Sequence, residues 1–378
     1  MKKVTKGLII VIFFAIWNCR KSVEPPLVQL FDVTRPIITI GGDIDNPNAR
    51  AYKIIDQYTI DRSGNIYIAS DVEYTIDKFD PQGRFLSAVG RKGQGPGEFD
   101  GGRIPSFGID SRGLIYTSSL KSRIVVLNPD GSLNKEYAFP PEAKNCQVGA
   151  IKVAPNDDVH VMFYEPGREA LLTRFSPGFT AYRVYHRTPA RRNTFLGGYL
   201  RFLPDFDFDE SGNVYITDGF EYRLLVYNAE GKLIRTFDRP FQKNRIVVAD
   251  LVLNSGNGQE LADFSRDPNA IKMVNGLSDT EGYLPSVFGV NLLEDGFILW
   301  TSNRDSEFRF FYDIYDKDFR LIGRSAAYNW VCYNSAHVRK NRIYLLDMGN
   351  DDTEFKKKIG RLSPSLFPFR VLVYELAP

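Results

Sequence analysis

The chain has 378 residues, of which 43% are hydrophobic and 25% are charged, the proportions of an ordinary soluble globular protein. Its 28 Phe and 20 Tyr against only 4 Met favour β-sheet over helix. The formal net charge of +2 becomes −1 without the three lysines near the N-terminus, which leaves 45 basic against 46 acidic residues, so the charge balance gives no indication of a nucleic-acid partner.

The first 18 residues are predicted to be an export signal peptide. Lysines precede an apolar run at 7–17, which is shorter than the roughly 20 residues that a membrane-spanning helix needs. Cys19 then stands where bacterial lipoprotein signals carry the cysteine that becomes lipidated, although larger residues replace the small ones common just before it. Residues 19–29 are predicted to be a polar tether. We therefore expect an exported protein of the cell envelope, anchored by lipid to a bacterial membrane; a plainly secreted protein and an uncleaved anchor are the alternatives.

A unit of four strands recurs along the chain. Each unit has an apolar strand, a tight turn with Gly, Asn or Asp, a strand rich in Ile, Val and Tyr, a loop, and a second hairpin. The first turns begin at residues 61, 110, 155, 209, 293 and 339. Most intervals are 45 to 54 residues, and one of 84 residues contains an insertion. This period predicts an all-β fold, a six-bladed β-propeller of four-stranded blades, whereas a β-sandwich explains neither the period nor the paired turns.

The two ends of the chain are expected to meet in one blade. The sixth unit lacks a fourth strand after FRVLVYELAP, and an unassigned strand, TRPIITIGG at 34–42, precedes the first unit. That strand is similar to the fourth strands GRFLSAVG and GKLIRTF. We therefore expect residues 35–41 to complete the last blade and residues 30–378 to form one closed ring.

A glycine-rich stretch, GRKGQGPGEF at 90–99, lacks the spacing of a phosphate-binding loop. It links the fourth strand of the first unit to the second unit, so we expect its glycines to be hinges and Phe99 to be a wedge between blades. Residues 90–116 resemble the NHL-repeat family of propellers, whose G-x-x-G-x-G-P-G-E-F link precedes a strand and D-x-x-G-x-I-Y. The later places of that motif are occupied by Asp110, Gly113, Ile115 and Tyr116. An exported six-bladed chain of this kind is similar to the bacterial 6-bladed β-propeller lipoproteins, and the resemblance, over about residues 30–378, implies fold alone.

The longest insertion, 239–285, falls between the fourth and fifth blades. Within it DPNAIKMVNG predicts a short helix, with Asp267 as N-cap, Pro268 at the first helical position and Gly276 just past the end. The lipoprotein propellers that the chain resembles also carry helical insertions at this place. Such a helix can serve either as a lid over the central channel or as a decoration packed on the rim.

The two faces of the ring are expected to differ. All the tight Gly and Asp turns belong to one face, whereas the blade-to-blade links and the second-to-third loops belong to the other. Long irregular loops on a rigid frame commonly carry binding residues, so we expect the ligand on this long-loop face. The side chains that open the first strands, together with a basic link into blade four, suit an anionic or sugar-like ligand. The ligand-binding candidates are Arg103, Gln147, Arg187, Arg191, Arg192, Arg201 and Trp330.

Catalysis and metal binding have weaker support in the sequence. His160, His186 and His337 occupy different strand positions and should not converge on a zinc ion, so no metal, no cofactor and no catalytic residue is expected. Acidic and amide side chains that follow the second strands should stabilise loops instead of forming a calcium site, as should a pair formed by Asp218 and Arg223. The former are Asp71, Asp218, Asn303, Asp305 and Asp347.

The preferred functional interpretation is therefore a non-catalytic binding propeller for a protein, peptide or carbohydrate partner, with no nucleic acid. The alternative is a propeller enzyme, a lyase or hydrolase with or without a metal, with its site at the central channel. Cys146 and Cys332 belong to units three and six, which lie opposite each other in a six-membered ring. A disulfide needs Cα atoms within about 7 Å, so we expect both to be free thiols.

Overall fold

The structure is a computed structural model of the whole chain. The residues that it describes are 25–41, 50, 52, 55–70, 74–93, 95, 98, 99, 104, 106–119, 122–165, 168–189, 191, 192, 201–218, 220–245, 268, 272, 283–304, 310–326, 336–347 and 369–377.

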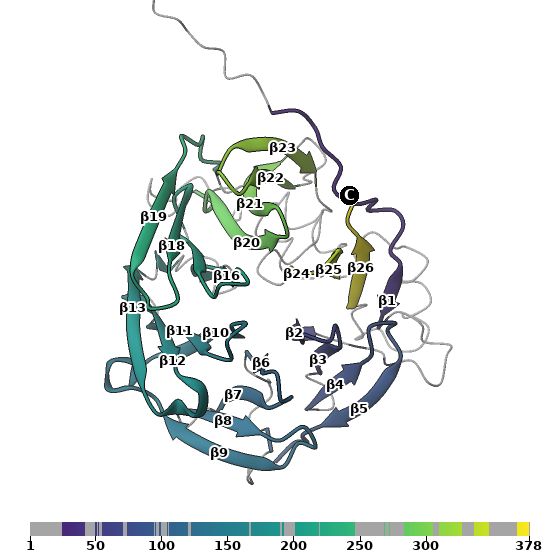
Figure 1. Cartoon of the computed structure of the whole chain (residues 1–378), viewed down its shortest axis with the longest axis vertical. Helices are drawn as coiled ribbons and strands as arrows, with labels where there is room; N and C mark the ends of the chain where they lie inside the picture. The colour runs from purple at the N-terminus through teal and green to yellow at the C-terminus, as the bar shows by residue number, and fades with distance from the viewer. Residues whose placement is uncertain are drawn as a thin grey trace, which may run out of the picture.

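Six four-stranded antiparallel sheets are arranged as blades around a central axis (Figure 1). Within blades 1 to 5 the chain runs from the innermost strand outward and neighbouring strands pair in sequence order, whereas in blade 6 the outermost strand comes from the N-terminal end of the chain. The prediction of a six-bladed propeller with four-stranded blades is therefore confirmed.

The strands of each blade have the following bounds. Blade 1 consists of β2 (Ile55–Ile60), β3 (Ile66–Ser70), β4 (Thr75–Phe79) and β5 (Phe85–Val89), and blade 2 of β6 (Gly108–Ile109), β7 (Ile115–Ser119), β8 (Arg123–Leu127) and β9 (Leu133–Ala138). Blade 3 consists of β10 (Gln147–Val153), β11 (Val159–Glu165), β12 (Glu169–Phe175) and β13 (Tyr182–Pro189), and blade 4 of β16 (Phe206–Phe208), β17 (Val214–Thr217), β18 (Arg223–Tyr227) and β19 (Leu233–Asp238). Blade 5 consists of β20 (Val287–Leu293), β21 (Gly296–Arg304), β22 (Phe310–Asp316) and β23 (Leu321–Ala326), and blade 6 of β24 (His337–Arg339), β25 (Arg342–Asp347), β26 (Arg370–Glu375) and β1 (Ile38–Ile40).

The ring is closed by the N-terminal strand, as predicted. β1 pairs with β26 in the register Ile38 to Val373 and Ile40 to Val371, and it is the outermost strand of blade 6. Ile40 is also buried in the cluster between blades 6 and 1. A strand from one end of the chain and three from the other thus form one blade, which joins the ends of the ring without a covalent link.

The recurring Asp and Gly of the first turns are explained by hairpin geometry. Asp61, Asp110 and Asp209 each accept, through Oδ1, a hydrogen bond of 2.9 Å from the backbone N–H four residues later. The glycine three residues after each of them has a φ between +77° and +89°, which side-chain-bearing residues rarely adopt. The Tyr116 hydroxyl also donates to Asp110 at 3.0 Å. The D-x-x-G-x-I-Y pattern is therefore a device that shapes turns.

The glycine-rich link holds the junction between blades 1 and 2. Phe99 is buried in a hydrophobic cluster that also contains Val89 of blade 1 and Ile115 of blade 2. It therefore lies between the two blades as the predicted wedge. Gly90 has a φ of +86°, and a Cβ there would come within 2.3 Å of the Phe99 ring. The Gly95 N–H donates to Glu98 of the same loop at 2.8 Å. The Gly95 N–H, a group that could otherwise bind a phosphate, is thus already bonded to an acceptor within the loop.

Residues 25–33 run along the outer edges of blades 5 and 6 (Figure 1). Leu27 pairs in parallel with Arg324 of β23, and the Val28 N–H donates to the Arg324 carbonyl at 2.8 Å. Phe31 is buried, with its ring 6.0 Å from that of Tyr312 in blade 5 and 5.1 Å from that of Tyr374 in blade 6. Residues 26–29, expected in the tether, therefore lie against the propeller; residues 19–24 lie outside the described residues.

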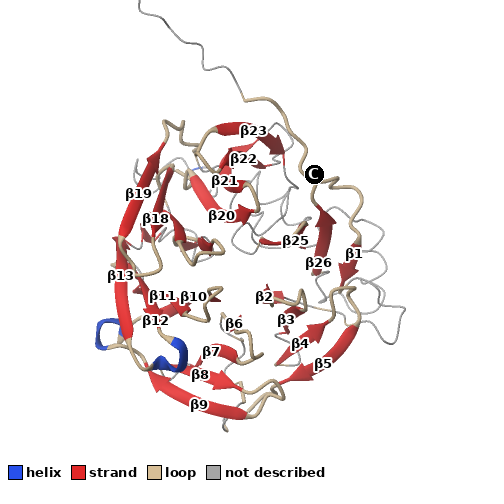
Figure 2. Cartoon of the chain, in the orientation of Figure 1, coloured by secondary structure: helices blue, strands red, loops and turns tan. Residues whose placement is uncertain are grey.

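Helix is scarce in the described residues (Figure 2). Two short 3-10 helices, η1 (Pro141–Ala143) and η2 (Pro177–Phe179), lie beside blade 3. The helix expected within the insertion 239–285 lies outside the described residues apart from Pro268 and Lys272. Among the helices that the structure describes, none is long and apolar enough to cross a membrane.

Candidate functional site

A cavity of about 90 Å³ lies on the propeller axis at the tight-turn end. Its walls are formed by the last residues of innermost strands from blades 1, 2, 3, 4 and 6, together with two turn residues. This follows from the topology, because every innermost strand runs toward the tight-turn face and the six strand ends meet only at the axis. The lining side chains belong to Thr59, Ile60, Arg62, Ile109, Lys152, Val153, Pro155, Asp207, Phe208, His337, Val338 and Arg339.

A buried ion pair ties blades 3, 4 and 5 together beside this cavity. Lys152 Nζ, near the end of β10, lies 2.9 Å from Asp205 Oδ1, and these side chains are only 16% and 9% exposed. The other carboxylate oxygen of Asp205 accepts from the Val290 N–H of β20 at 3.1 Å. Removing one member of a buried ion pair typically costs about 3–5 kcal/mol, because the other charge stays desolvated. Loss of either Lys152 or Asp205 should therefore destabilise the fold beside the cavity.

Asp207 and His337 are the titratable groups that complete the inner wall. Asp207 Oδ2 accepts from the Leu292 N–H of blade 5 at 3.0 Å, and burial raises the pKa of this carboxyl. His337 Nε2 lies 3.0 Å from the Tyr58 carbonyl oxygen of blade 1. Burial, assisted by the charge of Lys152, lowers the pKa of His337 to about 3, so the ring is neutral at neutral pH and donates to that carbonyl.

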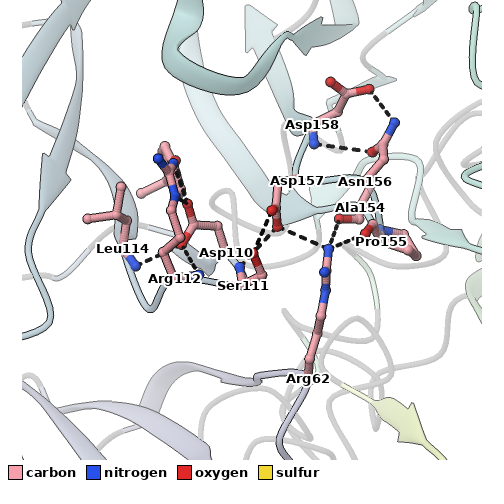
Figure 3. Close-up of polar contacts among 11 residues, drawn as sticks. Arg62, Asp110, Ser111, Arg112, Leu114, Ala154, Pro155, Asn156, Asp157 and Asp158 are labelled. Carbon is pink, nitrogen blue, oxygen red and sulfur yellow. Dashed lines mark hydrogen bonds and ion pairs between the residues drawn. The ribbon is translucent and has the colours of Figure 1, made fainter.

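Arg62 reaches from the first turn of blade 1 to the first turn of blade 3 (Figure 3). Its guanidinium donates to Asp157 Oδ1 at 3.0 Å and to the carbonyl oxygens of Ala154 and Pro155. Asp157 also accepts from the Ser111 hydroxyl of blade 2 at 2.6 Å. Three consecutive blades are thus linked at the mouth of the cavity.

Two of the candidates predicted from the sequence, Gln147 and Arg187, are described with their side chains and do not line this cavity. Gln147 opens β10 at the opposite end of the strand, where it accepts from the Tyr164 hydroxyl at 2.6 Å. Arg187, in the outer strand β13, pairs with Glu169 at 3.1 Å. The backbones of Arg192 and Arg201 do meet, because β14 (Arg191–Arg192) pairs with β15 (Arg201–Phe202).

Two of the predicted ligand-binding residues, Arg103 and Trp330, lie outside the described residues. So do most of the long loops of the face to which they were assigned. A ligand on the long-loop face therefore stays a prediction, and the cavity above lies at the other end of the channel.

The three histidines lie in β11, β13 and β24, as the strand assignments predicted. His160 Nδ1 is 2.8 Å from the Tyr185 hydroxyl, and His186 Nδ1 is 3.0 Å from that of Tyr227. Burial lowers the pKa of His160 to about 3. Within the described ranges no group of three His, Cys, Asp or Glu side chains could hold a metal ion. The absence of zinc from the whole chain stays a prediction.

The side chains that follow the second strands have local partners. Arg223 Nη1 lies 3.6 Å from Asp218 Oδ2, so the predicted pair forms, although Arg223 Nε is closer to Asp238 at 2.5 Å. Asn303 accepts from Asn244 at 3.1 Å, and Asp347 from Arg370 at 2.9 Å. Asp71 and Asp305 lie outside the described residues.

Cys146 is a buried free thiol whose pKa is raised by burial. Cys332 and Cys19 lie outside the described residues, so the lipid attachment and the absence of a bridge stay predictions.

The sequence reasoning missed Lys152, Asp205, Asp207 and Arg339. The predicted residues include those that open the first strands, whereas the cavity is lined mainly by residues that close them. Part of the signal was present, because a polar residue stands two places before the first tight turn in four units: Thr59, Asp207, Asn291 and His337. Only the closed ring shows that these places converge.

Comparison with known proteins supports the fold. The sequence model of a family described as "6-bladed beta-propeller" (DUF5128) matches residues 53–165. No curated protein sequence matches the chain. A member of the DUF4221 family from Bacteroides vulgatus superposes with a TM-score of 0.53 at 11% identity, over 90% of this chain and 96% of that one. A candidate exported protein of Bacteroides fragilis superposes with a TM-score of 0.52 at 12% identity, over 94% and 99%. Likeness at such identities concerns the fold alone.

Proposed function

We propose that this protein is an exported, lipid-anchored, non-catalytic binding propeller whose ligand is held by polar side chains on the axis of the ring. The observation that carries this proposal is the axial cavity itself, a small polar space walled by five blades of a rigid frame. Binding sites are commonly concave spaces with a few convergent polar groups, and a frame held by interlocking blades is preorganised to keep such groups in place.

Binding is favoured over catalysis by the state of the titratable groups around the cavity. Lys152 is paired with Asp205, and Asp207 accepts from a neighbouring backbone N–H. His337, with a pKa of about 3, is too weak a base to hold a proton at neutral pH. Each group is bonded into the frame instead of being directed at a reacting atom. Appearance of a product from any substrate in the presence of the purified protein would favour the enzyme alternative.

The binding proposal is tested by thermal unfolding of the purified protein with sugars, short peptides, small anions and divalent metals. A ligand at 100 times its Kd stabilises the folded state by about 2.7 kcal/mol, so at least one class should raise the Tm. Thr59→Trp, which fills the cavity, should abolish that shift. Thr236→Trp, on the exposed rim strand β19, is the matched control and should leave it unchanged. A shift that survives Thr59→Trp would place the ligand elsewhere.

Export and anchoring rest on the short apolar run and on Cys19, and the candidate exported protein of Bacteroides fragilis shares the fold. The acyl chains are the only anchor proposed, so Cys19→Ala should move the protein from the membrane to the soluble fraction of a fractionated cell. A variant that stays with the membrane would contradict lipid anchoring without affecting the binding proposal.

A further inference from the structure

The cationic side chains around the axial cavity are not all paired with a carboxylate. Three cationic side chains line it: Arg62, Lys152 and Arg339. Arg62 is matched by Asp157 at 3.0 Å, and Lys152 by Asp205 at 2.9 Å. Among the residues that the structure describes, Arg339 has no such partner.

Arg339 is the last residue of β24 and is half-buried. Throughout the part of the chain that the structure describes, its guanidinium makes no hydrogen bond and no ion pair. Asp207, the one carboxylate in the lining, has its oxygens engaged by the N–H groups of Leu292 and Phe208, and burial raises the pKa of this carboxyl. Arg339 is therefore the cationic side chain of the lining that lacks a carboxylate partner among the described residues.

We propose that the tight-turn end of the channel binds a small oxyanion, a carboxylate or a phosphate, with Arg339 as its main contact. This inference rests on the proposed function, since it names the chemical class of ligand for the same cavity. A guanidinium presents a planar fork of N–H donors that matches two oxygens of a carboxylate or phosphate. A neutral sugar would leave the charge of Arg339 uncompensated, and a metal cation would be repelled by all three cationic side chains.

The size of the cavity limits the ligand to a small free anion or to one anionic group of a larger molecule. One buried water occupies roughly 10–15 Å³ of such space, against the 90 Å³ of this cavity. The cavity thus has room for several waters or for one such group. Thr59 lines the same space and supplies a hydroxyl beside the cations.

The experiment measures the Tm of the purified full-length protein with sodium acetate, sodium succinate or sodium phosphate. Sodium chloride keeps the ionic strength constant and serves as the reference, because general screening by salt would otherwise change the Tm. We expect at least one oxyanion to raise the Tm above the chloride value, and isothermal titration with that anion to give its Kd. A larger Tm shift with acetate or succinate than with phosphate would indicate a carboxylate site, and the reverse would indicate a phosphate site.

Substitutions then locate the contact. Arg339→Gln should weaken binding of that oxyanion at least tenfold, about 1.4 kcal/mol. Arg123→Gln is the matched control, because it removes the same charge at a position away from the cavity. The Arg123 side chain is on β8 and is 51% exposed. This control should leave the Kd unchanged. If Arg339→Gln does not fold, Arg339→Lys keeps the charge but loses the fork, and it should weaken binding by about threefold or more.

Two results would overturn the inference: no oxyanion shifts the Tm beyond chloride, or Arg339→Gln and Arg339→Lys bind as tightly as the wild type. These results are distinguishable from failure of the proposed function. If peptides or sugars raise the Tm and oxyanions do not, only the oxyanion inference fails. If no class of ligand raises the Tm, the binding proposal fails with it.

Discussion

The contact between Gly90 and Phe99 allows a quantitative test of the glycine-rich link as architecture. Phe99→Ala removes a ring that is only 6% exposed, and such substitutions cost about 3–5 kcal/mol. Gly90→Ala requires an alanine at φ +86°, which costs about 1–2 kcal/mol. It also places a Cβ 2.3 Å from Phe99 Cε2, and overpacking of that kind adds about 1–3 kcal/mol. In the double variant the ring is gone, so the overpacking cost of Gly90→Ala should disappear. Only its backbone cost then adds to the cost of removing the Phe99 ring.

The free energy of unfolding of the double variant should therefore exceed the additive value by about 1–3 kcal/mol, measured by urea denaturation of all four proteins. Gly64→Ala is the matched control: φ is +89°, but the nearest atom to its Cβ, on Pro81, is 3.5 Å away. It should cost about 1–2 kcal/mol and be additive with Phe99→Ala, since no clash is relieved. Additivity within about 0.5 kcal/mol for the Gly90 pair would refute the wedge.

Three further predictions concern the frame. His160 and His337 have folded pKa values of about 3 against 6.5 for free histidine, so the unfolded chain takes up protons first as the pH falls. The free energy of unfolding should thus decline between pH 6.5 and 3 by up to about 1.4 kcal/mol per pH unit per histidine, and His160→Gln and His337→Gln should each give a shallower decline in urea titrations. Deletion of Thr34 to Gly42 should expose β26 as an edge and cause aggregation in size-exclusion chromatography; a monomer that melts like the wild type would disprove ring closure. Cys146 and Cys332 should both react with an alkylating agent in denatured, unreduced protein, and a mass two hydrogens lower would show a bridge instead.

The blade count and its local devices could be read from the sequence, because they depend on short-range chemistry that repeats. A turn that begins at Asp61, Asp110 or Asp209 needs its aspartate and a glycine three places on wherever it occurs. The spacing of such turns gives the number of blades. Phe99 and the closing strand β1 were predictable in the same way, since each occupies a defined place in a unit.

The site was not readable in this way, because its contacts join residues that only ring closure brings together. Lys152 and Asp205 belong to different blades, and so do Arg62 and Asp157, and His337 and Tyr58. The same holds for Leu27 against Arg324, where part of a predicted tether pairs with blade 5. Periodicity says where a strand ends but not which other ends it faces. The sequence by itself determined the turns, the period and the six blades; the tertiary structure decided which charges meet on the axis, because that depends on how six twisted sheets close around it and leave Arg339 without a partner among the described residues.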